Sequence, residues 1–232
     1  MASCETCVVR NRAICAALDD AELKVLNSIG RRRTIKAGES LIFEGDDSVL
    51  VANVIDGVLK LSSGTADGRE QILGVVYPSE FIGRPFGATT GHDVTALTDA
   101  KVCVFSRRDF DAFAGEHPAL EHKLLERTLA ELDRTRKALL LLGRKSAAEK
   151  VATFLIEMAD RLSDSGCSSL KAPGPVTLTL PFSRQQIADV LGLTIETVSR
   201  QFTQLKNSGV IDLPSRREVA LLDRNALENA AG

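Results

Sequence analysis

The chain has 232 residues, of which 44% are hydrophobic and 26% are charged, and its formal net charge is −2 at pH 7. This length suits two domains, and no apolar stretch approaches the roughly 18 residues of a membrane span, which excludes a membrane-spanning protein. The charged, cysteine-containing N-terminus lacks the apolar core of an export signal, so we expect a cytoplasmic protein. A net charge near zero leaves little non-specific affinity for nucleic acid, so any DNA binding would depend on local contacts.

Three cysteines lie close together at the start of the chain. Cys4, Cys7 and Cys15 form the pattern C-x2-C-x7-C. A disulfide framework is not expected in a cytosolic protein of this size. A C-x2-C pair could hold zinc or act as a redox dithiol, but zinc normally takes four ligands, and no second pair of cysteines or histidines follows.

Two further cysteines lie later in the chain. Cys103 lies inside the strand-like segment KVCVFS, and Cys167 lies in a Ser/Gly-rich stretch without cysteine neighbours. Three clustered thiolates and one thiolate on a rigid strand suit an iron–sulfur cluster, so Cys103 is the predicted fourth ligand. The alternative for Cys103 is a small apolar side chain in the core. Cys167 is left outside the predicted site.

Residues 40–107 contain short apolar runs separated by turns that are rich in glycine and aspartate. The segments LIFEG, VANVIDGVLKLSSG, EQILGVVYPSEFIG and DVTALTDAKVCVFS predict short strands, and Asp67-Gly68 is a favourable hairpin turn. Many short strands at regular spacing predict an antiparallel roll or barrel. Helices over residues 20–29 and 108–114 are expected to flank it, so the predicted fold class is α+β.

A long helix is predicted from about Pro118 to about Leu142. Its leucines recur in a near-heptad pattern that suits a two-stranded coiled coil, so we predict a homodimer through this helix. The alternative is a helix that only covers the roll. Gly143 is expected to act as a hinge before a helix over residues 146–162, and residues 163–176 are expected to form a loop. The predicted dimer residues are Leu125, Leu129, Leu132, Leu139 and Leu142.

Residues 183–209 predict two short helices joined by a tight turn. Ser183 and Thr194 can cap the two helices by accepting bonds from free backbone N–H groups, and Gly192 permits the positive φ that ends the first helix. This is the pattern of a helix-turn-helix, whose second helix enters the DNA major groove. The apolar stripes expected from helical spacing are Ile187, Val190 and Leu191 in the first helix and Ile195, Val198, Phe202 and Leu205 in the second.

The outward face of the second helix carries side chains that suit base edges. Arg200 can donate two bonds to guanine O6 and N7, and Glu196 can accept one from cytosine N4; the alternative is an ordinary solvated face. The following segment VIDLPSRREVALLD predicts two short strands, a wing with arginines at its tip near phosphate. The predicted DNA contacts are Glu196, Thr197, Ser199, Arg200, Arg216 and Arg217.

The sequence has no constellation that suggests catalysis. It contains no phosphate-binding glycine-rich loop, no nucleophile–base pair and no paired carboxylates in a pocket-like context. We therefore expect that the protein is not an enzyme.

The cysteine triplet, the later Cys103 and the segment ETVSR at residues 196–200 together resemble the CRP/FNR family of bacterial transcription regulators, and within it the FNR-type oxygen sensors. The resemblance spans essentially the whole chain. It implies inverted-repeat operators of the type TTGAT-N4-ATCAA in double-stranded DNA, read by the three side chains Glu196, Ser199 and Arg200. It also implies a [4Fe–4S] cluster whose ligands are Cys4, Cys7, Cys15 and Cys103.

Two features place the chain within this family. The gap between Cys7 and Cys15 is longer than in enteric FNR proteins and is similar to that of alphaproteobacterial relatives. The stretch FIGRPFGATTGHDVTAL lacks the Gly-Glu and Arg-Ser/Thr elements with which the cyclic-AMP branch binds phosphate, so no cyclic nucleotide is expected. The family further implies contact with RNA polymerase through loops of the roll near Asp67 or Arg84.

The resemblance and the pattern together predict four parts: a cysteine-rich segment (1–19), a β-roll sensor domain similar to cyclic-nucleotide-binding domains (20–115), a dimerisation helix (116–143) and a winged helix-turn-helix domain (144–232). The expected function is an oxygen-responsive DNA-binding regulator in which the cluster controls dimerisation. The alternative is a regulator of the same fold that is constitutive or is gated by nitric oxide, zinc or thiol redox chemistry.

Overall fold

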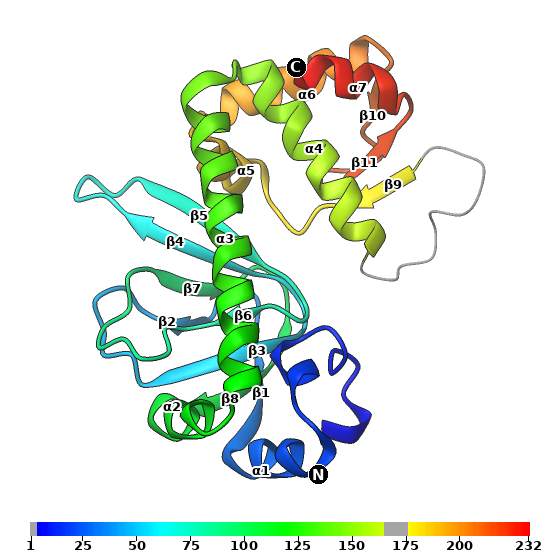
Figure 1. The fold of residues 1–232 in the computed structure, drawn as a ribbon. Helices are drawn as coiled ribbons and strands as arrows, with labels where there is room; N and C mark the ends of the chain where they lie inside the picture. The colour runs from blue at the N-terminus through cyan, green and yellow to red at the C-terminus, as the bar shows by residue number, and fades with distance from the viewer. Residues whose placement is uncertain (1–3, 165–175) are drawn as a thin grey trace. The chain divides into compact units, whose positions relative to one another are not determined.

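The computed structural model describes residues 4–164 and 176–232 of the chain (Figure 1). It divides into two compact units, residues 1–135 and 136–232, and each is described by itself. The boundary between the units falls within the long helix α3 (Pro118–Arg144). The four-part division expected from the sequence stays a prediction. Within the described residues, no helix combines the length and the hydropathy that crossing a bilayer requires.

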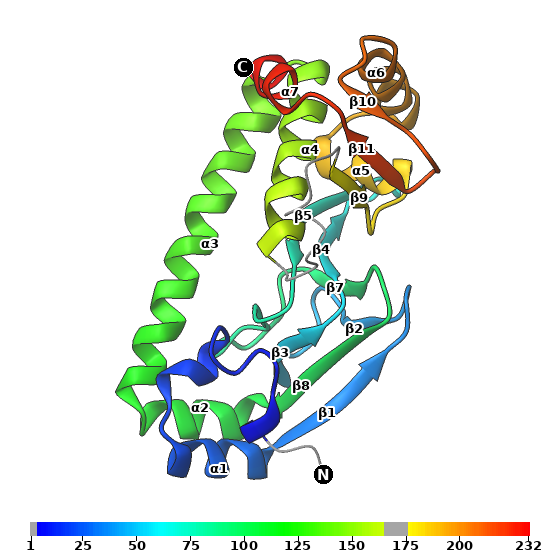
Figure 2. The ribbon, with the colours of Figure 1, turned by 90° about the vertical axis from the view of Figure 1, so that its right-hand side faces the viewer.

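The first unit is built around an antiparallel roll of two four-stranded sheets, which confirms the predicted fold class (Figures 1 and 2). The strand orders are β1-β8-β3-β6 and β2-β7-β4-β5. Between the sheets lies an apolar core in which Ile35, Val54, Leu59 and Val102 are fully buried. The strands are β1 (Gly30–Ile35), β2 (Ser40–Ile42), β3 (Leu50–Asp56), β4 (Leu59–Gly64), β5 (Glu70–Val76), β6 (Phe81–Ile82), β7 (Asp93–Ala96) and β8 (Ala100–Ser106).

The hairpin between β4 and β5 turns at Asp67-Gly68, as predicted. Gly68 has a φ of 86°, which lies in the region that favours glycine. Its backbone N–H donates to the Thr65 carbonyl at 2.9 Å, and the Thr65 N–H donates to the Arg69 carbonyl at 2.9 Å.

A second core joins the N-terminal segment to the outer face of the roll and to α3. The segment contains two short 3-10 helices, η1 (Cys4–Thr6) and η2 (Ile14–Ala17), and Figure 2 shows it beside the first turns of α3. The predicted flanking helices are both present, as α1 (Asp20–Ile29) and α2 (Arg107–Gly115). The largest fully buried side chains of this core are Ile14, Leu26, Phe105, Phe110 and Leu120.

The helix α3 begins at Pro118, as predicted, where the missing N–H of proline would have no partner in any case. It ends at Arg144, so the expected hinge residue Gly143 lies inside its last turn, and the break before α4 falls one to two residues later. Four of the five leucines predicted to form the dimer interface are exposed, namely Leu125, Leu129, Leu132 and Leu139, and Leu142 is half-buried.

The second unit combines helices with a small antiparallel sheet of order β10-β11-β9. Its first helix, α4 (Ala147–Asp164), begins one residue after the predicted start and extends into the predicted loop. Residues 165–175 of that loop, with Cys167, lie outside the described residues, and its last residue, Val176, begins a strand instead. The unit then contains β9 (Val176–Thr179), α5 (Arg184–Leu191), α6 (Ile195–Asn207), β10 (Ile211–Asp212), β11 (Glu218–Leu221) and α7 (Arg224–Ala231).

The cap of α5 offers a test of how local sequence stabilises the second unit. Replacing Ser183 by Ala removes the side-chain acceptor for the Gln186 N–H and should lower the free energy of unfolding by about 1 kcal/mol. Denaturant unfolding of the full chain, followed by circular dichroism, measures the change. Thr203→Ala on the exposed side of α6 is the control and should stay within about 0.5 kcal/mol of the parent; equal losses in both variants would contradict the capping role.

Candidate DNA-binding surface and cysteine-lined cavity

Local hydrogen bonds fix both helices of the predicted DNA-binding motif. Ser183 Oγ accepts from the Gln186 N–H at 3.2 Å, and the Ser183 N–H donates to Gln186 Oε1 at 2.8 Å, a reciprocal capping box. Gly192 ends α5 with a φ of 59°. Thr194 Oγ1 accepts from the Thr197 N–H at 3.3 Å and so caps α6. The two-helix pattern predicted from the sequence is therefore present.

The apolar stripes pack the two helices together with one exception. Ile195, the first residue of α6, keeps 37% of its surface exposed, so burial of the predicted stripe begins only at Val198. The sequence analysis overlooked Arg184, whose guanidinium carbon lies 3.6 Å from the centroid of the Phe202 ring, a cation–π contact between α5 and α6. Ile187, Leu191, Val198 and Phe202 are buried, and Val190 and Leu205 are half-buried.

All three predicted base-reading residues lie on the exposed side of α6. Glu196, Ser199 and Arg200 are exposed, whereas Thr197 is half-buried and belongs to the cap. The backbone N–H of Glu196 and then the Thr194 hydroxyl lower the pKa of the Glu196 carboxyl. Glu196 is therefore held as a carboxylate, the form that accepts a hydrogen bond from a base amino group.

A turn after β10 carries the two wing arginines. Strands β10 and β11 pair antiparallel, with Ile211 opposite Leu221, and the segment between them exposes Arg216 and Arg217. Ser215 Oγ shapes this turn by accepting from the backbone N–H of Arg217 at 3.4 Å and from the next N–H at 3.1 Å. The strand β9 pairs on the other side of β11, so the sheet has one strand more than the predicted wing.

The four predicted cluster ligands all line one cavity of about 350 Å³ in the first unit. Cys4 lies in η1, Cys7 follows it, Cys15 lies in η2 and Cys103 lies on β8. All four are half-buried free thiols. The structure therefore brings together the residues that the sequence analysis selected, from segments almost one hundred positions apart.

The strand register explains why Cys103 faces this cavity. It lies opposite Arg32 on β1 and opposite Asn53 on β3, so the three side chains share one face of the sheet. Gly30 lies at the edge of the same face: a Cβ there would lie 3.3 Å from Cys103 Sγ and 2.6 Å from Phe105 Cε1. The bare backbone of Gly30 leaves room beside the Cys103 sulfur.

The electrostatics of the cavity oppose ionisation of its thiols. Burial, followed by the neighbouring cysteines, raises the pKa of Cys15 to about 12 and that of Cys103 to about 11. Burial and then Cys7 also raise the pKa of Cys4, while Arg32 acts in the opposite direction on Cys4 and Cys103. Four thiolates can occupy this cavity together only if positive charge lies between them, and a bound metal provides such charge.

The arrangement of the four cysteines bears on the kind of metal centre that they could hold. In a [4Fe–4S] cluster, each cysteine binds a different iron, so its four ligands surround a cavity instead of one point. Four cysteine thiols around one cavity, with space beside Gly30, fit such a cluster.

Comparisons with known proteins identify the family. Residues 149–230 match the Crp-like helix-turn-helix domain, and residues 32–117 match the cyclic nucleotide-binding domain. The transcriptional activator protein FnrL of Cereibacter sphaeroides is 43% identical over 99% of this chain and 92% of its own length. The chain belongs to the CRP/FNR family of transcription regulators. This membership also confirms the expectation that the protein is not an enzyme.

Two further relatives agree with this assignment. The nitrogen fixation regulation protein FixK of Bradyrhizobium diazoefficiens is 39% identical over 98% of this chain and 93% of its own length. The solved structure of FixK2 from Bradyrhizobium japonicum is 32% identical, has a TM-score of 0.78, and covers 88% of this chain and 98% of its own.

Three residues of the cavity wall were missed in the sequence analysis. Gly30, Arg32 and Asn53 line the cavity together with the cysteines. Asn53 carried a visible signal, because it is the one amide inside the otherwise apolar run VANVI. Gly30 and Arg32 carried none, since their relation to Cys103 depends on the pairing of β1 with β8, which a single sequence does not specify.

Proposed function

We propose that this protein is an oxygen-responsive transcriptional activator in which a [4Fe–4S] cluster controls dimerisation and binding to TTGAT-N4-ATCAA operators. The observation that carries the proposal is the convergence of four cysteine thiols on one cavity beside the base of α3. The similarity to the activator FnrL supports the same assignment. The cluster would be held by Cys4, Cys7, Cys15 and Cys103.

If all four cysteines bind one cluster, the N-terminal segment is tied through that cluster to Cys103 on the roll. A bound [4Fe–4S] cluster would supply redox chemistry that responds to oxygen. Cys103 is fixed by its strand, so it serves as the anchor. Cys4, Cys7 and Cys15 lie on a segment with only short 3-10 turns, whose position depends on side-chain packing and on this anchor.

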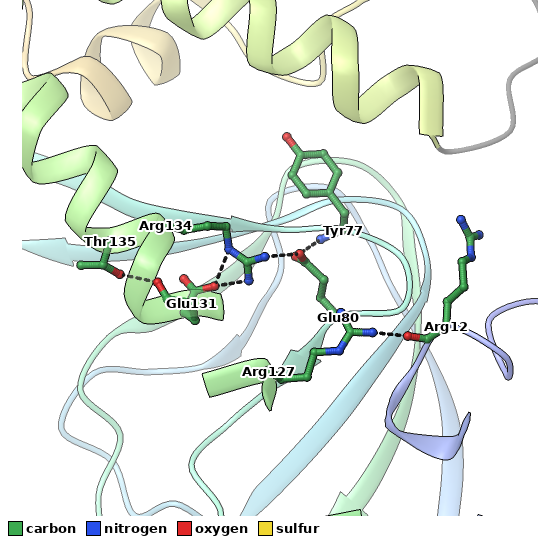
Figure 3. Close-up of polar contacts among 7 residues, drawn as sticks. All are labelled: Arg12, Tyr77, Glu80, Arg127, Glu131, Arg134 and Thr135. Carbon is green, nitrogen blue, oxygen red and sulfur yellow. Dashed lines mark hydrogen bonds and ion pairs between the residues drawn. The ribbon is translucent and has the colours of Figure 1, made fainter. Parts of the chain in front are cut away.

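Two kinds of contact connect that segment to α3. Ile14 and Leu18 pack in one cluster with Leu120 and Leu124 of the helix. In addition, an Arg127 N–H donates to the backbone carbonyl of Arg12, which lies between Cys7 and Cys15 (Figure 3). Movement of the cysteine segment would therefore change the support of the first half of α3.

Further along α3, an ionic network attaches the helix to the roll. Arg134 Nη1 lies 3.3 Å from Glu80 Oε1, and Arg134 Nε donates to Glu131 Oε2 at 2.8 Å (Figure 3). Glu80 Oε2 in turn accepts from the Tyr77 backbone N–H at 3.0 Å. These contacts give α3 a defined position against the roll, which the cysteine segment can bias.

We infer that α3 forms the homodimer through its exposed leucines. Leu125, Leu129, Leu132 and Leu139 are 54%, 53%, 42% and 66% exposed, a costly arrangement unless another surface covers them. A coiled coil of two α3 helices would cover them, with Leu142 continuing the pattern. A coupling of about 1–3 kcal/mol between the cysteine segment and this interface would change operator affinity about 5- to 150-fold.

In the dimer, two copies of α6 would enter successive major grooves about 34 Å apart. Arg200 would read guanine, Glu196 would accept from cytosine, and Ser199 would contact a neighbouring base edge, with Thr197 beside them. The wing arginines Arg216 and Arg217 would contact phosphate.

Other partners follow from the family in the same way. We expect contact with RNA polymerase through roll loops near Asp67 or Arg84. We expect no cyclic nucleotide, because the segment around Arg84 lacks the phosphate-binding elements of the cyclic-AMP branch.

Iron and sulfide analysis tests the cluster directly. Protein purified without oxygen should be brown and contain about four iron and four sulfide per chain. Cys103→Ala should lose most of both, because it removes the rigid ligand, whereas Cys167→Ala should keep them. Colourless, iron-free parent protein would overturn the cluster, and stoichiometric zinc or reversible thiol oxidation would favour the alternative gating by those groups.

Substitution of Arg200 tests base reading. Arg200→Ala should weaken binding to the TTGAT-N4-ATCAA duplex by about 1–3 kcal/mol and relax the preference for guanine. Arg216→Ala is the control, because loss of a phosphate contact should weaken binding to all sequences and reduce the salt dependence by about one counterion. Affinities measured by fluorescence anisotropy at several salt concentrations separate the two; an equal loss of Arg200→Ala on random DNA would make Arg200 a phosphate contact.

Removal of the Arg127 contact tests coupling between the cysteine segment and α3. Arg127→Ala should keep iron and sulfide but reduce the difference in dimerisation between anaerobic and air-exposed protein by several fold, because the link to the Arg12 carbonyl is lost. Sedimentation analysis measures this difference. Lys123→Ala, which breaks only an ion pair to Glu126 on the same helix, is the control. Unchanged coupling in Arg127→Ala would exclude this contact as the link.

A further inference from the structure

We propose that Asn53 is a positioning residue for the cluster: its side-chain amide donates a hydrogen bond to the Cys15 sulfur and thereby raises the reduction potential of the bound cluster. This inference rests on the proposed function, because it assigns a role to a residue of the cavity wall only if a cluster is present. The experiment described below distinguishes failure of the inference about Asn53 from failure of the proposed function.

The first support is geometric. Asn53 Nδ2 lies 3.8 Å from Cys15 Sγ, within range of an N–H···S hydrogen bond, and Asn53 lies opposite Cys103 in the register of β3 and β8. The side chain is 2% exposed and lines the same cavity as the four cysteines. The Asn53 amide thus contacts the sulfur of Cys15 in the N-terminal segment. Cys103, which lies opposite Asn53 on the neighbouring strand, supplies the fourth sulfur.

The second support is the cost of an amide at this position. Asn53 Oδ1 is buried and has no hydrogen-bond partner among the described residues. Its strand neighbours Val51, Ala52 and Val54 are fully buried apolar side chains. An apolar side chain at position 53 would fit the strand as well and would leave no buried acceptor unpaired. The amide therefore does not stabilise the fold. The donor group of Asn53 therefore serves the cavity.

Hydrogen bonds to cluster sulfurs are among the factors that set the reduction potential. The reduced cluster carries more negative charge than the oxidised cluster. An N–H dipole directed at the Cys15 sulfur would therefore stabilise the reduced cluster more than the oxidised one. Removal of the donor should therefore lower the potential, and a cluster with a lower potential gives up an electron more easily. It should also strengthen the bond between iron and the Cys15 sulfur, because that sulfur no longer shares its electrons with the N–H group.

Another amide at the same cavity provides the matched control. The Cys4 thiol donates to Asn27 Oδ1 at 3.2 Å, and Asn27 lines the cavity as well, but it is exposed on α1. Asn27 is therefore an acceptor and directs no N–H group at a cysteine sulfur, so its removal should leave the potential near that of the parent.

The test uses full-length protein prepared without oxygen, as the parent and as Asn53→Ala, Asn53→Leu and Asn27→Ala. The two Asn53 variants remove the same donor while changing side-chain volume in opposite directions. Both should keep iron and sulfide, show a lower midpoint potential in a dithionite titration, and shift the iron–cysteine stretching bands upward in resonance Raman spectra. Both should also lose the cluster absorbance several-fold faster in air, and Asn27→Ala should resemble the parent.

The outcomes separate the possible readings. Shifts of opposite sign in the two Asn53 variants, or no shift of potential in either, would overturn the proposal and make Asn53 a packing residue. An equal shift in Asn27→Ala would also overturn it, because the effect would then not depend on the buried donor. If both Asn53 variants fail to bind iron, circular dichroism decides: a folded apo-protein supports a requirement for the donor. If Asn53→Leu alone loses the cluster, the leucine excludes it sterically, and Asn53→Ala decides: a lower midpoint potential supports the proposal, and an unchanged one overturns it. Parent protein without iron and sulfide would refute the proposed function itself.

Discussion

The first unit depends on one packing constraint, the docking of the cysteine-bearing N-terminal segment against β8 and α3. This segment has no strand and no α-helix of its own, so backbone hydrogen bonds alone cannot fix it. Burial of Ile14 and Leu18 against Phe105 and Leu120 holds it in place instead. The same packing places Cys15 above the sheet face that carries Cys103, so the site exists only while the segment is docked.

Docking and cluster binding would stabilise each other, because the cavity is electrostatically unfavourable for its own thiols. Burial and mutual repulsion raise the pKa of Cys15 and Cys103, and the guanidinium of Arg32 only partly opposes this for Cys103. Binding of metal requires deprotonated sulfurs and provides the positive charge that they need, so its free energy adds to the free energy of docking. Loss of the cluster would then leave the segment held by its apolar packing and by polar contacts such as that of Arg127 with the Arg12 carbonyl.

Much of this arrangement was predictable, and the exceptions have physical causes. Short-range signals gave correct results: the caps Ser183 and Thr194, the turns at Gly68 and Gly192, and the start of α3 at Pro118. Each depends on residues within one or two turns of the chain. The cavity wall could not be predicted in the same way, because Arg32 and Asn53 meet Cys103 through strand pairing between distant segments.

The errors at element ends have a similar origin. A glycine inside a helix costs only about 1 kcal/mol, so Gly143 was a weak indicator of a hinge, and α3 continues to Arg144. Ile195 was assigned to the buried stripe from its spacing, but a residue at the first position of a helix lacks neighbours on its N-terminal side, and it stays partly exposed. The predicted base readers and cluster ligands occupy suitable positions, and their roles remain predictions.

The magnitudes explain how so small a contact between the N-terminal segment and α3 can matter. The hydrogen bond from Arg127 to the Arg12 carbonyl is exposed to solvent, so it is worth about 0.5–1.5 kcal/mol. The coupling that a regulator of this kind needs is about 1–3 kcal/mol. In the proposed dimer, the exposed leucines of α3 would form an interface whose stability such a bias could shift.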